Sequence, residues 1–132
     1  MQVYKLLIIP FLLVSLNVEA EQTRCLAQAI YHEARGEPLR CQHMVADVVL
    51  NRMQHRNYPS TVCGVVFQRS QFSWTRHSPR ITDNKAWQRS IELARYKLST
   101  RNKTTTAIYF TQGRRFGPVV ARCGKHIFMR ST

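Results

Sequence analysis

The segment Leu26-Ala-Gln-Ala-Ile-Tyr-His-Glu-Ala-Arg-Gly-Glu37 carries the pattern that decides the fold of the first half of the chain. Leu26, Ala29 and Ile30 stand at i, i+3 and i+4, which predicts a helix whose apolar face meets the core. Glu33 follows at i+7 on the same face. A carboxylate on the core side of a helix costs free energy unless it is paired or takes part in chemistry.

The predicted position of Glu33 would raise the pKa of its carboxyl group. It falls in the last turn of the helix, where the negative end of the helix dipole disfavours a carboxylate, and partial burial acts in the same direction. A raised pKa is what a general acid in glycosidic bond cleavage needs near neutral pH. The alternative is a structural carboxylate that pairs with Arg35, Arg52 or another arginine.

The residues around this first helix predict where it begins and ends. We expect it to run from about 24 to 35, with Thr23 or a neighbour as N-cap. Gly36 ends it, and Pro38 disfavours helical geometry at the residue before it. The remaining elements predicted from periodicity and capping are helices over 39–53 and 83–98, the latter capped by Asp83, a short helical turn or strand over 62–67, and strands over 107–111 and 126–129. Helices followed by a small sheet predict an α+β domain, mainly helical with a short antiparallel sheet.

The N-terminal residues 1–20 are typical of a secretory signal peptide rather than of the fold. Lys5 gives the start a positive charge, residues 6–16 are mostly apolar, and Ala20 ends a Val-Glu-Ala stretch that suits signal peptidase. This apolar run is shorter than the about 20 apolar residues that a membrane span needs, which favours a cleaved signal peptide. The alternative is a retained N-terminal anchor. Cleavage after Ala20 leaves residues 21–132, enough for one compact domain and not for two. We therefore expect an exported protein of the periplasm or the extracellular space.

Four cysteines, Cys25, Cys41, Cys63 and Cys123, follow the predicted signal peptide. An even number in a small exported domain predicts two disulfides, and the sequence alone leaves three pairings open. Zinc binding is disfavoured because no two of these cysteines have the spacing of a zinc knuckle.

The formal net charge of +13 indicates a polyanionic partner. In an exported protein this charge favours an anionic cell wall or membrane surface over nucleic acid, so we expect no nucleic-acid partner. We also expect a monomer.

Other catalytic arrangements fail on spacing. His32-Glu33 begins a zincin-like motif, but Gly36 stands where the second histidine is required. A Cys–His amidase would need a free thiol, whereas an even set of exported cysteines is better explained by disulfides. We expect neither a metal nor a cofactor. A conventional glycosidase needs two carboxylates about 5 to 9.5 Å apart, and Glu37 is the sole candidate for the second. Gly36 and Pro38 on either side of Glu37 indicate that it fixes a turn instead, so a mechanism with one carboxylate fits the sequence better.

Five blocks of the sequence follow one another in a characteristic order. They are Ala29-Ile-Tyr-His-Glu-Ala-Arg-Gly-Glu-Pro38, Val48-Val-Leu-Asn-Arg52, Tyr58-Pro-Ser-Thr-Val-Cys-Gly-Val-Val66, Gln71-Phe-Ser-Trp-Thr75 and Ile108-Tyr-Phe110. Together they resemble the SleB-type cell wall hydrolase family, the spore-cortex-lytic enzymes and their relatives among bacterial and phage wall hydrolases.

This resemblance implies a small lysozyme-like domain with lytic transglycosylase activity on the MurNAc–GlcNAc bond of peptidoglycan glycan strands, as in a phage endolysin or a secreted lysin. It implies that Glu33 is the catalytic acid and base. The residues that it implies for substrate binding are Gln71, Phe72, Ser73 and Tyr109. Glu37, the second glutamate of the first block, and Trp74, beside Gln71, are further candidates for substrate binding. For Trp74, packing is the alternative to stacking on a sugar.

The chain departs from the family pattern in the region of the last block and at its cysteines. Thr111 stands where family members often carry His, and the stretch after Gly113 is shortened and unusually basic. Cys41 replaces the usual Gly, and Cys123 also stands where the family usually lacks cysteine. The resemblance therefore implies a Cys41–Cys123 disulfide.

By the same argument Cys25 is left to pair with Cys63. Two other functions stay open beside the transglycosylase: a muramidase that hydrolyses the same bond with Glu33 and a water, and a cationic wall-binding or membrane-binding protein without catalysis.

Overall fold

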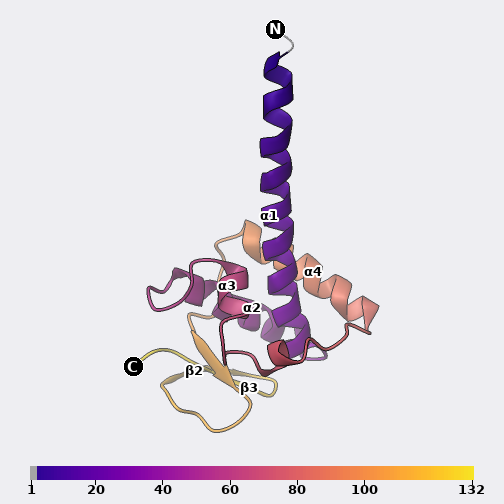
Figure 1. Ribbon diagram of the computed structural model, residues 1–132. Coiled ribbons are helices and arrows are strands. Elements are labelled where there is room, and N and C mark those ends of the chain that lie inside the picture. Colours follow the sequence, from indigo (N-terminus) through magenta and orange to yellow (C-terminus); the bar gives the residue numbers. More distant parts are fainter. Residues whose placement is uncertain (1–2) are drawn as a thin grey trace.

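The computed structural model describes residues 3–132, and the side chains of residues 12–132. Its elements are α1 (Val3–Ala34), α2 (Leu39–Gln54), α3 (Val62–Val66), the 3-10 helix η1 (Ser73–Arg76), α4 (Asn84–Ser99), β1 (Tyr109–Thr111), β2 (Val119–Cys123) and β3 (His126–Met129). Figure 1 shows the other helices gathered around the C-terminal half of α1, with the sheet beyond its C-terminal end. The predicted α+β class is confirmed.

Helix α1 begins long before the predicted start near residue 24, so that prediction was wrong. Residues 12–23 contain neither Gly nor Pro, and nothing in that stretch ends a helix. Thr23 lies inside the helix, where its hydroxyl donates a hydrogen bond of 2.9 Å to the carbonyl of Glu19 instead of capping an end. The N-terminal half of α1 projects away from the other elements (Figure 1), and its apolar side chains from Leu12 to Val18 are exposed. No helix within residues 3–132 is long and apolar enough to cross a membrane.

The core lies where the C-terminal half of α1 packs against α2, α3 and α4. Leu26, Ala29 and Ile30 are fully buried there, which confirms the apolar face predicted from their spacing. Burial of one large aliphatic side chain contributes about 1.5–3 kcal/mol, so this face fixes α1 against its neighbours. As a result, the last turn of α1 and Glu33 are held at the boundary of the core.

Tyr31 joins α1 to the beginning of α4. Its hydroxyl accepts hydrogen bonds from the backbone N–H groups of Thr82 (3.2 Å) and Asp83 (3.1 Å), and its side chain is buried. Asp83 caps α4 as predicted, since its carboxylate accepts a 3.0 Å hydrogen bond from Ala86 N–H. The segment that precedes α4 is therefore tied to the helix that carries Glu33.

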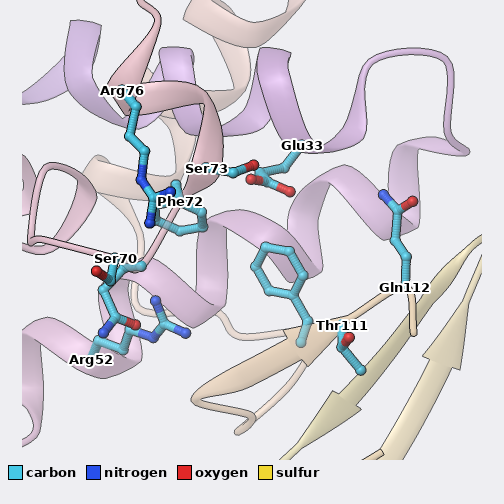
Figure 2. Close-up of a pocket in the computed structure, with 10 residues that line it drawn as sticks. Glu33, Arg52, Ser70, Phe72, Ser73, Arg76, Thr111 and Gln112 are labelled. Atoms are coloured by element: carbon cyan, nitrogen blue, oxygen red, sulfur yellow. The ribbon is translucent and has the colours of Figure 1, made fainter. Parts of the chain in front are cut away.

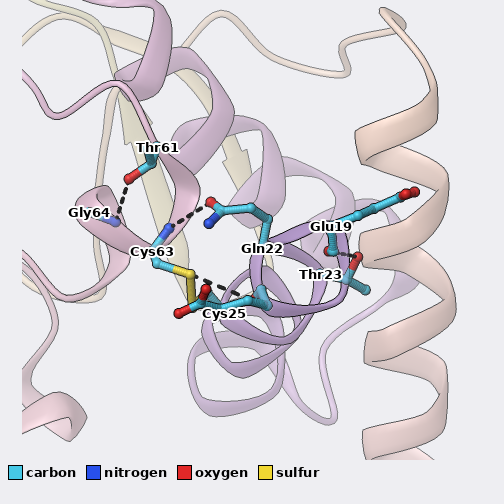
Figure 3. Close-up of a disulfide and its surroundings, with 8 residues drawn as sticks. Glu19, Gln22, Thr23, Cys25, Thr61, Cys63 and Gly64 are labelled. Carbon is cyan, nitrogen blue, oxygen red and sulfur yellow. Dashed lines mark hydrogen bonds between the residues drawn. A yellow bond between two sulfur atoms is a disulfide. The ribbon is translucent and has the colours of Figure 1, made fainter. Parts of the chain in front are cut away.

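Two disulfides connect the elements, and they are the pairs that the resemblance implied. Cys25 of α1 is bonded to Cys63 of α3, with 5.2 Å between their Cα atoms, and Cys41 of α2 is bonded to Cys123 of β2, with 5.4 Å. Figure 3 shows that the backbone N–H of Cys63 also donates to the side chain of Gln22, at 3.2 Å. The short helix α3 is thus fixed to α1 by a covalent and a polar contact.

The sheet has the order β1-β3-β2, and both pairings are antiparallel. The strand predicted over 126–129 is observed as β3. The strand predicted over 107–111 is shorter than predicted, because β1 covers only its last three residues. Strand β2 was not predicted from the sequence; it lies at an edge of the sheet, and its side chains are alternately half-buried and exposed. Gly124 makes the turn from β2 to β3 with a φ of +55°, a conformation that glycine adopts without strain.

Candidate active site

A cleft of about 420 Å³ opens beside the C-terminal end of α1. Figure 2 shows its walls, which come from α1, α2, the segment around η1 and the end of β1. Its lining residues are Glu33, Arg52, Ser70, Gln71, Phe72, Ser73, Arg76, Phe110, Thr111 and Gln112. Glu33 is the one carboxylate among these ten residues.

The carboxyl group of Glu33 is half-buried in this cleft. Burial raises its pKa above the ordinary value, and this effect exceeds the opposing effects of Trp74 and Arg52, which favour the charged form. The Trp74 indole N–H is buried and has no partner at ordinary hydrogen-bond geometry within the described residues, which leaves it free to interact with the carboxylate. The pKa of Glu33 is therefore shifted in the direction expected from the sequence, and burial is the main cause of the shift.

Arg52 is a buried cation in the wall of the cleft, with a side chain only 5% exposed. Its Nε donates a 2.7 Å hydrogen bond to the carbonyl of Ile108. The guanidinium carbon lies 5.4 Å from the ring centroid of Tyr58, 5.6 Å from that of Phe72 and 6.0 Å from that of Tyr109. Aromatic faces attract a cation at such distances, so these three rings compensate part of the free-energy cost of burying the charge of Arg52.

Glu33 and Arg52 influence each other without forming an ion pair. The ion pair found among the described residues is Lys97–Asp47, so neither Arg52 nor Arg35 neutralises Glu33 at contact distance. Arg35 instead donates from Nη1 to the hydroxyl of Tyr31, and its guanidinium lies 4.5 Å from the centroid of that ring. Glu33 is therefore held at the cleft surface by the core and remains open to a ligand.

The segment before and within η1 brings three of the predicted binding residues to the cleft. Gln71, Phe72 and Ser73 line it; Phe72 is buried, and the other two are exposed. Trp74 lies behind this wall, with its ring centroid 4.5 Å from that of His32 and 6.2 Å from that of Phe72. The contacts of Trp74 are those of a packing residue that also reaches Glu33.

Glu37 and Tyr109 are not among the residues that line the cleft. The carboxylate of Glu37 faces the β2–β3 turn, where a Cβ at Gly124 would collide with it. Burial lowers the pKa of His126 below its ordinary value, and the charge of Glu37 opposes this shift only in part. Tyr109 contacts Arg52 and the ring of Phe116, at 5.5 Å.

The cleft is also lined by Ser70, Arg76, Phe110 and Gln112, which were not predicted as site residues from the sequence. Gln112 follows β1 and is placed by a buried partner, since its Nε2 lies 3.2 Å from Nε2 of His126. Ser70 and Arg76 flank the Gln71 block, whereas Phe110 ends the Ile108 block and Gln112 lies two residues after it. This closeness to the two blocks is the signal that could have found them. Among the described residues, no three His, Cys, Asp or Glu side chains are grouped to hold a metal ion.

Known proteins are similar to this chain in sequence. Residues 36–129 match the family described as Cell Wall Hydrolase. The spore cortex-lytic enzyme of Bacillus subtilis is 34% identical over 119 residues, covering 80% of this chain and 36% of that protein. The corresponding enzyme of Oceanobacillus iheyensis is 32% identical over 116 residues, covering 80% of this chain and 40% of that protein. The chain thus spans well under half the length of these curated relatives.

Solved structures show the same lysozyme-like fold. The catalytic domain of the Bacillus cereus SleB protein matches with a TM-score of 0.67 and 29% identity, covering 83% of this chain and 89% of that one. The catalytic domain of the germination-specific lytic transglycosylase SleB from Bacillus anthracis matches with the same TM-score and identity, and 93% of it is covered. From the family match, the sequence relatives and these folds together, the chain belongs to the cell wall hydrolase family.

Proposed function

We propose that this chain is a lytic transglycosylase that cleaves the MurNAc–GlcNAc bond of peptidoglycan, with Glu33 as its general acid and base. The observation that carries the proposal is that Glu33 is the one carboxylate among the residues lining the cleft, and that its pKa is raised. The solved neighbour from Bacillus anthracis is itself named a lytic transglycosylase, which supports this reaction class. The family match begins at Gly36, after Glu33, so the role of Glu33 rests on its place in the cleft.

The proposed reaction needs one carboxyl group in two successive roles. The neutral carboxyl of Glu33 first donates its proton to the glycosidic oxygen, and the bond from that oxygen to C1 of the muramoyl sugar breaks. The carboxylate then accepts the proton of the C6 hydroxyl of the same sugar, whose oxygen bonds to C1 and closes a 1,6-anhydro ring. Because the nucleophile belongs to the substrate, no second carboxylate is needed in the cleft.

Arg52 suits both halves of this cycle. Its buried charge lowers the pKa of Glu33 while burial of Glu33 raises it, so the group can be protonated at the start and charged in the second half. We infer that Gln71 and Ser73, which are exposed on the cleft wall, hold the sugar hydroxyl and acetamido groups by hydrogen bonds. Phe72 would offer an apolar ring edge to the same strand.

The proposed setting of the reaction is the cell wall outside the cytoplasmic membrane. The strongly positive charge of the chain would hold a monomeric, exported enzyme on an anionic wall or membrane surface by long-range attraction. Salt screens such attraction over a distance of about 10 Å at 0.1 M. We therefore expect the rate of wall lysis to fall as ionic strength rises, and an unchanged rate on intact wall would contradict this setting.

The products of digestion test the reaction itself. Purified sacculi digested with the protein should release muropeptides with 1,6-anhydro ends, each lighter by one water than the hydrolysis product, as read by mass spectrometry. Reducing muramoyl ends would instead favour a hydrolysing muramidase that uses Glu33 and a water. Cell lysis that survives in a folded Glu33→Gln variant would favour a non-catalytic cationic binding protein.

A further inference from the structure

Residues 113–118 belong to the loop that connects β1 to β2, and they carry an exposed aromatic ring beside two cations. Phe116 is 65% exposed, the highest value among the large apolar side chains of residues 12–132. Arg114 and Arg115 precede it and are also exposed. A single exposed apolar residue needs no explanation by itself. Two structural features of this loop, however, indicate a binding surface.

The first feature is that the loop is held in place. The backbone N–H of Phe116 donates to Sδ of Met129 at 3.4 Å, and Arg130 N–H donates to the carbonyl of Pro118 at 3.0 Å. The ring of Phe116 meets that of Tyr109 edge to face, with 5.5 Å between centroids. A ring that is already oriented loses little conformational entropy when it binds a ligand.

The second feature is that the loop is continuous with the cleft. Thr111 and Gln112 line the cleft and lead directly into the loop. Tyr109, which packs against Phe116, lies 6.0 Å from the guanidinium of Arg52, and Arg52 lines the cleft as well. Figure 2 shows Thr111 and Gln112 on one side of Glu33, and Arg52 and Arg76 on the other side. A polymer that crosses the cleft past Glu33 toward the Gln112 side therefore approaches this loop.

We infer that Phe116, Arg114 and Arg115 form a second glycan-binding site, which holds the peptidoglycan strand beyond the bond that is cut. The inference rests on the proposed function, because it takes the occupant of the cleft to be a glycan strand. The apolar face of a sugar ring stacks on an aromatic ring, and guanidinium groups bind carboxylates such as those of the peptides that peptidoglycan carries. A neutral glycan would use the aromatic ring alone, so the pair of arginines selects strands with acidic substituents.

Binding is measured first, in a chain that cannot digest its ligand. In a Glu33→Gln background, the additional Phe116→Ala substitution should weaken binding to purified sacculi about five- to tenfold in a sedimentation assay, since a stacking contact is worth roughly 1 kcal/mol. Phe116→Tyr should bind like the parent because it keeps the ring. Arg114→Gln with Arg115→Gln should weaken binding at low salt and change little at high salt. Tyr96→Ala is the matched control, because Tyr96 is 46% exposed on α4 and should leave binding unchanged.

Cleavage of strands of different length then separates a binding site from a structural role. In the active chain, Phe116→Ala should raise KM on long strands and leave kcat/KM on a short fragment that fills only the cleft near the parent value. Equal loss on both substrates, or unchanged binding of sacculi, would overturn the inference. So would a loss of binding to anionic phospholipid vesicles without a loss on sacculi, since that result would assign the loop to a membrane. Failure of the proposed function shows separately, as absence of glycan cleavage by the parent chain.

Discussion

Nζ of Lys97 lies 2.7 Å from Oδ1 of Asp47, and the two side chains are 2% and 0% exposed. The other carboxylate oxygen of Asp47 accepts hydrogen bonds from the backbone N–H groups of Thr104 and Thr105. Lys97 Nζ donates in addition to the carbonyl of Asn102. This buried pair therefore joins α2, α4 and the loop that leads to β1, the strand that carries one wall of the cleft.

Breaking the Lys97–Asp47 pair should destabilise the fold strongly. Lys97→Met leaves the Asp47 charge buried without its cation, which typically costs about 3–5 kcal/mol in the free energy of unfolding. Urea denaturation measures this difference, with Glu92→Gln on the exposed side of the same helix as control. A Lys97→Met protein within about 1 kcal/mol of the parent, the range of an exposed pair, would show that the pair contributes little.

Glu33→Gln should abolish glycan cleavage and leave the fold intact. Gln keeps the size of the side chain but can neither deliver nor accept the proton, and loss of general acid–base catalysis typically lowers the rate about 100- to 10,000-fold. Release of anhydro-muropeptides from sacculi measures the activity, and circular dichroism the fold. Glu37→Gln is the matched control and should lose less, because Glu37 lies outside the cleft lining. A folded Glu33→Gln protein with near-parental activity would refute the assignment.

The same substitution should not lower stability at neutral pH. Burial raises the pKa of Glu33 in the folded state above its unfolded value of 4.5. The stabilising contribution of the protonated group is therefore complete below that value and is lost as pH rises through the folded pKa. Above the unfolded value, folding must either protonate this carboxyl group or bury its charge, and Gln avoids both costs, so the melting temperature of Glu33→Gln at pH 7 should equal or exceed that of the parent.

Removing the charge of Arg52 should change the pH dependence of catalysis. Because Arg52 lowers the pKa of Glu33, Arg52→Met should raise that pKa further and move the high-pH limb of the kcat profile upward. The rate at its optimum should fall, since the carboxylate needed in the second half of the reaction is then less stable. Arg52→Lys keeps a cation and should shift the limb less. If the high-pH limb of the kcat profile is at the same pH in the parent and in Arg52→Met, this result would contradict electrostatic coupling between Arg52 and Glu33.

Each disulfide should stabilise the folded chain by about 2–4 kcal/mol. In the chain-entropy account, the Cys41–Cys123 bond should contribute more because it closes 82 residues, against 38 for Cys25–Cys63. Thermal denaturation of the two paired Cys→Ser variants, each with both partners replaced, measures the difference. Peptide mapping under non-reducing conditions that found four free thiols would contradict the prediction.

Export with cleavage after Ala20 stays a prediction. The expected mature chain begins at Glu21 and is recovered from the periplasm or the medium, as N-terminal sequencing would show. An intact chain beginning at Met1 in the membrane fraction would indicate a retained anchor instead. In the folded structure Ala20 lies within α1, so cleavage is expected before the chain folds.

The sequence by itself determined the elements whose signals are local. The spacing of Leu26, Ala29 and Ile30 predicted the buried face of α1, and Asp83 predicted the start of α4, because periodicity and capping act within a few residues. The same local signals predicted that Glu33 lies at the boundary of the core and that the pKa of its carboxyl group is raised. The start of α1 was predicted wrongly, because a capping residue such as Thr23 also fits inside a helix when nothing before it ends the helix.

Only the tertiary structure decided which distant residues meet. Asp47 stands outside the apolar face of α2 in sequence, yet it is fully buried because α4 and the loop after it cover that side of the helix. Glu37 lies only four positions after Glu33, yet its carboxylate faces the β2–β3 turn and not the cleft. The reason is that the chain changes direction at Gly36, whose φ is +83°. Gln112 and Arg76 enter the cleft because β1 packs against α2 and because Trp74 of η1 contacts His32 of α1. Such contacts depend on how whole elements pack, and no pattern within one segment of the chain contains that information.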